Sequence, residues 1–111
     1  MMDIKEQFSN QLISEQYRLV AKAWVEADGV ARLLEETKTA VLAQWVKKHG
    51  DMAVNAAERE VKSSPEWEEF IAKMVDARTA ANLKKVQLEF IRMKSAEQQS
   101  AEASKRAEMR L

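Results

Sequence analysis

The stretch KKHGDMAVNAAEREVKSSPEWEEF, residues 47–70, carries the strongest turn signals in this sequence and predicts how the fold is connected. Near its start, Gly50 follows two lysines and His49, a pattern typical of a helix that ends with a C-terminal glycine. Asp51 can then cap another helix, because its side-chain oxygen accepts hydrogen bonds from free backbone N–H groups. We therefore expect one helix to end near residue 49 and a short helix to follow over about residues 52–62.

The end of the same stretch, SSPEWEEF, predicts the start of a third helix. Ser63 or Ser64 is the expected N-cap, and Pro65 falls in the first turn, where its missing N–H group loses no hydrogen bond. Glutamates follow at once, and their charges favour the positive end of the helix dipole. We therefore expect two long helical arms, about residues 5–49 and 65–110, with the short helix at the tip between them.

The composition agrees with an all-α protein. The chain has 111 residues, which suits a single domain over residues 1–111. It contains only two glycines and one proline, and aromatic residues make up 6%, so turns and strand formers are scarce. Two arms of similar length joined at one end predict a long antiparallel helical hairpin with coiled-coil-like packing.

Apolar residues recur three and four positions apart along both arms, a spacing that averages about 3.5 residues and is typical of coiled coils. The row in the first arm comprises Ile13, Tyr17, Val20, Trp24, Ala27, Ala31 and Leu34, and continues less regularly to Val41 and Trp45. The row in the second arm comprises Phe70, Met74, Ala77, Ala81, Lys84, Leu88 and Ile91, with Trp67 and Ile71 beside its start. We expect these two rows to form the contact between the arms.

The second arm carries another apolar row on a different face of the helix. It comprises Val75, Leu83, Val86, Phe90 and Met93. A hairpin has only one inner face, and an exposed apolar row usually marks a contact with a partner. We therefore predict that this row binds a second copy of the chain or another helical protein, and that the protein is a dimer. The alternative is that the short helix, or a bent first arm, covers the row.

The second arm also has a row of basic residues at intervals of seven: Arg78, Lys85 and Arg92. Such a row can follow a phosphate backbone, which favours a nucleic-acid partner. The alternative is that these side chains flank the contact between the arms, where their stems cover apolar surface and their charges pair with acids.

The sequence offers little for catalysis or for binding a cofactor or metal. It contains no cysteine, which excludes disulfides and thiolate chemistry, and its single histidine, His49, is expected at a helix end. It has no glycine-rich phosphate loop and no paired metal-binding motif. We interpret its acidic residues as solvated helix faces and helix-start charges. We therefore predict that the protein is not an enzyme and uses no cofactor.

Charge and hydropathy bear on partners and location. Eighteen basic and eighteen acidic residues balance, so no overall field favours nucleic acid or acidic membranes. The N-terminal stretch MMDIKEQFSNQ lacks the apolar run of a signal peptide, and no segment approaches the roughly 18 apolar residues of a membrane span. We expect a soluble, cytoplasmic protein with no membrane partner.

Four short motifs in the second half of the chain are similar to those of a known group of proteins. They are Ser64–Pro65–Glu66, Asp76–Ala77–Arg78, Ala81–Asn82 and the ending Arg106–Ala107–Glu108–Met109–Arg110–Leu111. In these motifs the chain resembles small helical proteins encoded by tailed phages and prophages. Genes of that group often accompany genes for recombination or single-strand annealing. The resemblance therefore implies an accessory role in phage DNA metabolism, and it implies no active site.

Three functional hypotheses follow. The first is a non-enzymatic phage or prophage accessory protein that acts through helix-mediated protein contacts in DNA recombination or replication. The second is a nucleic-acid-binding protein that uses the basic row. The third is a structural coiled-coil or scaffold component.

Overall fold

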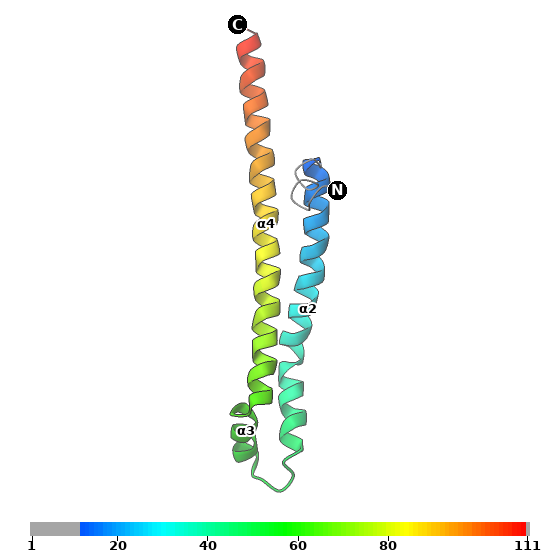
Figure 1. Ribbon diagram of the computed structural model, residues 1–111, viewed down its shortest axis with the longest axis vertical. Coiled ribbons are helices and arrows are strands. Elements are labelled where there is room, and N and C mark those ends of the chain that lie inside the picture. The colour runs from blue at the N-terminus through cyan, green and yellow to red at the C-terminus, as the bar shows by residue number, and fades with distance from the viewer. Residues whose placement is uncertain (1–11, 111) are drawn as a thin grey trace, which may run out of the picture. The chain divides into compact units, whose positions relative to one another are not determined.

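The computed structural model describes residues 12–110, and this range is almost wholly helical. Helix α2 spans Ile13–Lys47, the short helix α3 spans Val54–Lys62, and helix α4 spans Pro65–Met109. No strand occurs within the described residues. Helix α2 packs against α4, and α3 lies in the connection between them (Figure 1). The predicted all-α helical hairpin with a short helix in its connection is confirmed.

The helix ends follow the predicted turn signals closely, with small differences. Helix α2 ends at Lys47, and Gly50 adopts the left-handed conformation with φ of 56°. Glycine suits this position because a Cβ atom would crowd the backbone there. The predicted start of the first arm, at residue 5, lies outside the described residues.

The prediction that Asp51 caps the short helix is wrong. Helix α3 begins at Val54, and its N-cap position is Ala53, which makes no side-chain capping bond. The backbone N–H of Met52 instead donates to the carbonyl of His49 at 3.4 Å, so Asp51 lies inside a turn formed by residues 49–52. The side chain of Asp51 therefore lies too early in the chain to reach the free N–H groups of α3.

Helix α4 begins at Pro65, as predicted, and Ser64 is its N-cap. The backbone N–H of Trp67 donates to the Ser64 hydroxyl oxygen at 3.3 Å, which satisfies one of the free donors of the first turn. The same hydroxyl donates to the carbonyl of Val61 at 2.6 Å and so ties the end of α3 to the start of α4. Of the two serines considered, the structure selects Ser64.

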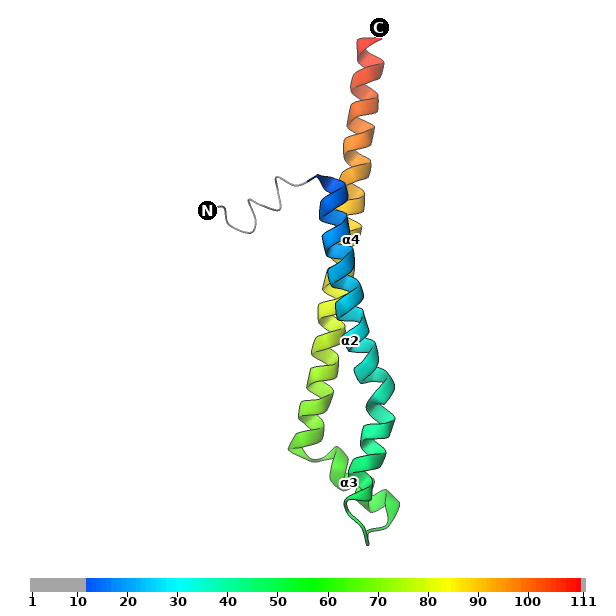
Figure 2. The same ribbon diagram turned by 90° about the vertical axis from the view of Figure 1, so that its right-hand side faces the viewer.

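The chain divides into two compact units. One, called the terminal unit, comprises residues 12–25 and 82–110 of the described chain; the other, called the connection unit, comprises Glu26–Ala81. Within the terminal unit a segment of α2 packs on a segment of α4, beside it in Figure 1 and in front of it in Figure 2. Its core contains the buried Val20, Leu88 and Ile91. The half-buried side chains that pack on this core are Ile13, Tyr17, Ala21 and Trp24.

The connection unit is held together by small residues and aromatic rings. Ala31 on α2 and Ala81 on α4 are both 0% exposed, and such small side chains allow helices to approach closely. Trp67 stacks on Phe70 with ring centroids 5.4 Å apart, and Trp45 meets Trp67 edge-on at 5.8 Å. Aromatic pairs in these geometries contribute about 0.5–1.5 kcal/mol beyond the area that they bury.

Both predicted contact rows are confirmed. Every residue named in the two rows is buried or half-buried. This includes Lys84, the one charged residue of the second row. Helix α4 also continues beyond this packing. All its residues from Ala96 onwards are exposed, and they are mostly strong helix formers that need no buried face to stay helical.

Candidate contact surface

The second apolar row of α4 is exposed to solvent. Within the terminal unit, the row consists of Leu83, Val86, Phe90 and Met93, which are 60% to 64% exposed. We call these four residues the α4 stripe. The fifth predicted member, Val75, is 52% exposed and belongs to the connection unit.

Helix geometry explains why the stripe is not part of the core. Successive residues turn by about 100° around a helix, so the stripe lies roughly opposite the side that carries Leu88 and Ile91. Those two residues are buried against α2. Neither α3 nor the described part of α2 covers the stripe, since all four of its side chains remain exposed. The role of the stripe as a contact surface stays a prediction.

The spacing of the stripe is that of a coiled-coil seam. Its members follow one another at intervals of three, four and three residues, and a seam of this kind buries its side chains only when another helix packs on it. The stripe combines aliphatic, aromatic and thioether side chains. Side chains of this kind, aromatic and methionine residues above all, are enriched at protein interfaces.

In the structure, the first member of the basic row, Arg78, bonds to carboxylates of α2. Arg78 donates to both carboxylate oxygens of Glu35, at 2.9 and 2.6 Å, and to Asp28 at 2.7 Å. Hydrogen bonding from Arg78 lowers the pKa of Glu35, and hydrogen bonding to Glu35 and then to Asp28 raises the pKa of Arg78. Asp28 also accepts a bond from Arg32 at 2.9 Å. Arg78 is thus a bridge between α4 and α2 within the connection unit, which is the pairing that the sequence analysis gave as the alternative.

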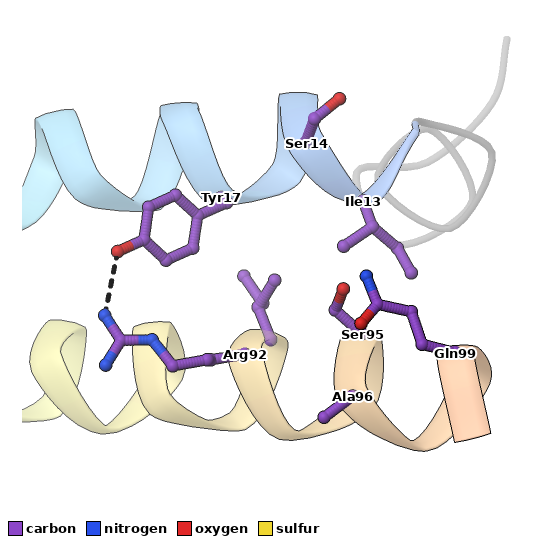
Figure 3. A pocket seen from close by; sticks show the side chains of 8 residues that line it. Ile13, Ser14, Tyr17, Arg92, Ser95, Ala96 and Gln99 are labelled. Carbon is purple, nitrogen blue, oxygen red and sulfur yellow. Dashed lines mark hydrogen bonds between the residues drawn. The ribbon is translucent and has the colours of Figure 1, made fainter.

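The other two members of the basic row lie in the terminal unit and differ from each other. Arg92 donates to the phenolic oxygen of Tyr17 at 3.1 Å (Figure 3), and this hydrogen bond raises the pKa of Arg92. Lys85 is exposed and takes part in no ion pair with the described residues. The structure therefore places the three basic side chains in three different environments.

A groove of about 530 Å³ lies beside the Tyr17–Arg92 contact (Figure 3). Its lining residues are Ile13, Ser14, Tyr17, Ile91, Arg92, Ser95, Ala96 and Gln99. Among the described residues, its polar groups are hydroxyls, an amide and a guanidinium, with no histidine or carboxylate that could serve as a general base.

Residues 12–110 contain no group of three or more histidine, aspartate or glutamate side chains placed to hold a metal ion. His49 lies in the turn after α2, where its backbone N–H donates to the carbonyl of Val46 at 3.1 Å. None of the described helices is both long and apolar enough to cross a membrane.

The carboxylates that hold Arg78 are not among the residues predicted from the sequence. Asp28 and Glu35 are seven residues apart, one repeat of the contact row, so both lie on the same flank of α2. This seven-residue spacing equals that of the basic row in α4. It is the sequence feature from which a pairing between the two helices could have been predicted. The spacing of the first contact row predicts Tyr17 only as a core residue, whereas its hydroxyl reaches the edge of the core and accepts the bond from Arg92.

Comparison with known proteins adds no relative: no family model matches the chain, and neither the curated proteins nor the solved structures contain a significant match.

Proposed function

We propose that this protein is a non-enzymatic accessory protein that works through helix-mediated protein contacts made by the α4 stripe. The observation that carries the proposal is the exposure of Leu83, Val86, Phe90 and Met93 on one side of a helix whose other side is buried. Leaving four large apolar side chains in water is unfavourable, at about 25 cal/mol for each Å² of apolar surface, and a partner helix removes that penalty.

The biological setting that we propose is a phage or prophage assembly for DNA recombination or replication, in the cytoplasm of the host. This part rests on the resemblance of the motifs around Pro65, Ala77 and Ala81 and at the C-terminal end. Examination of the neighbouring genes tests it directly. Genes for recombinases or annealing proteins on either side support the proposal, whereas capsid or tail genes would favour a structural role instead.

Photo-crosslinking in cells tests the contact surface itself. A photoreactive amino acid is placed at position 90 in the organism that carries the gene, and a matched variant carries it at position 98. Phe90 belongs to the stripe, and Gln98 is exposed on another side of the same helix. We expect crosslinked products from position 90 and few from position 98. If position 90 yields no product, or both positions yield the same products, the stripe is not the contact surface.

A further inference from the structure

The residues that flank the α4 stripe indicate what binds it. In a seven-residue repeat written a to g, Leu83 and Phe90 occupy position a, and Val86 and Met93 occupy position d. Glu89 then falls at position g, beside the seam, and Lys94 falls at position e on its other side. In coiled coils, charges at e and g set the choice of partner and the direction in which the helices run.

Glu89 and Lys94 are complementary to a second copy of the same helix. In a parallel pair, a residue at g faces the e residue five positions later on the other helix, and Lys94 is five positions after Glu89. A symmetric parallel pair would therefore form the Glu89–Lys94 ion pair twice. Glu89 interacts electrostatically with Arg92 of its own helix, but neither Glu89 nor Lys94 forms an ion pair with the described residues of its own chain.

The preceding repeat follows the same rule with amides in place of charges. Asn82 is at g and Gln87 is at e, both are exposed, and they are again five residues apart. An antiparallel pair centred on the stripe would instead place Glu89 opposite Glu89 of the second copy, and like charges facing each other are unfavourable. The flanking residues thus favour the parallel arrangement over the antiparallel one.

From this pattern we infer that the α4 stripe binds the α4 stripe of a second copy, in parallel and in register. The inference rests on the proposed function, because it uses the same surface and names its partner. The contact is short. Glu97 occupies the next a position and would face Glu97 of the other copy, so the apolar seam spans about two repeats. Such a contact should be reversible, with half-association at about micromolar concentration.

Charge reversal tests the register. Sedimentation equilibrium is measured for the parent, for Glu89→Lys, for Lys94→Glu and for the double variant, with helicity checked by circular dichroism. We expect each single variant to dimerise at least about tenfold more weakly, because like charges then face each other, and the double variant to regain the parent's affinity. Glu97→Leu should extend the seam and strengthen the dimer by a similar factor.

Disulfide trapping tests the direction of the helices. The natural chain has no cysteine, so a single introduced thiol reports only on its own surroundings. Met93→Cys should form a crosslinked dimer under mild oxidation, since equal d positions face each other in a parallel pair, and Gln98→Cys should not. In the antiparallel pair position 93 would face position 83 instead, about 15 Å along the helix from its own copy.

Three results would overturn the inference. The first is a parent protein that stays monomeric at about 100 μM, well above the expected midpoint. The second is a dimer that is unaffected by both charge reversals and gives no Met93→Cys crosslink. The third is a photo-crosslink from position 90 to a different protein and never to a second copy, which would leave the proposed contact surface standing and replace its partner. Absence of every crosslink from position 90 would remove the proposed function as well.

Discussion

Arg78 on α4 donates hydrogen bonds from two nitrogens of its guanidinium group to the two carboxylate oxygens of Glu35 on α2, at 2.9 and 2.6 Å. This two-point geometry fixes the rotation of both side chains, and the contact to Asp28 adds a third bond one repeat away along α2. The pairing joins residues 43 and 50 positions apart in the chain, and so it helps to fix the register of the two helices within the connection unit.

The first prediction concerns pH. The folded pKa of Glu35 is lowered from 4.5 by its hydrogen bond from Arg78, so this pair stabilises the fold above pH 4.5, and the stabilisation disappears as the pH falls through the lower, folded pKa. Glu35→Gln should therefore lower the melting temperature at pH 7, and the difference from the parent should be smaller at pH 3, because the carboxylate is protonated as the pH falls. Thermal unfolding followed by circular dichroism at both pH values measures this.

A matched control for Glu35→Gln is Glu36→Gln. Glu36 is the next residue of α2, is exposed, and forms no ion pair with the described residues. Its variant should melt close to the parent at both pH values. Equal effects of the two variants would show that the bridge to Arg78 adds nothing specific to stability.

The second prediction concerns the close approach of the helices at Ala81. This side chain is 0% exposed, so Ala81→Leu must push other atoms aside and should destabilise the protein by about 1–3 kcal/mol. Ala80→Leu is the control, since Ala80 is exposed and leucine is nearly as good a helix former as alanine. Urea unfolding should show a clear loss for the first variant and almost none for the second. Equal stability of the two variants would contradict the packing described at Ala81.

The third prediction compares the two glycines. Gly50 has φ of 56°, where a side chain is strained, so Gly50→Ala should destabilise the fold by about 1–2 kcal/mol. Gly29 lies inside α2, and a Cβ atom there would meet nothing within 4 Å. Gly29→Ala should therefore stabilise the fold by about 0.5–1 kcal/mol. The two substitutions are chemically identical, and opposite shifts in the urea midpoint are the expected outcome.

The fourth prediction concerns nucleic acid. Because Arg78 is held by two carboxylates and Arg92 bonds to Tyr17, we expect labelled single- or double-stranded DNA to show no saturable rise in anisotropy at about 0.15 M salt. A titration at low and moderate salt measures this. Saturable binding that falls steeply with salt and is lost in Lys85→Glu would favour the nucleic-acid alternative over protein contact.

Much of the fold could be predicted from the sequence because its signals are local or periodic. The rows from Ile13 to Trp45 and from Trp67 to Ile91 identify the buried faces, since a spacing of about 3.5 residues keeps side chains on one side of a helix. The same reasoning found the exposed stripe, because a helix that is buried on one side leaves its opposite side free. The start of α4 followed from Pro65 and the serine before it.

Two features could not be read from the sequence, because each depends on backbone or side-chain contacts that lie outside a single helix. Asp51 is a good capping residue, yet it lies inside a turn formed by residues 49–52, and α3 starts at Val54 without a side-chain cap. Arg78 and Arg92 have the charge and the spacing of a phosphate-binding row. Only their neighbours on α2 reveal that they bond within the protein.

The sequence by itself determined that this chain is helical, where α2 and α4 end or begin near the connection, and which sides of the long helices are apolar. These properties depend on backbone preferences and on spacing along a single helix. The tertiary structure decided which side chains of α2 meet which side chains of α4. That register arises only when two segments far apart in the chain pack together, so that Arg78 finds Glu35, Arg92 finds Tyr17, and Phe90 is left facing the solvent.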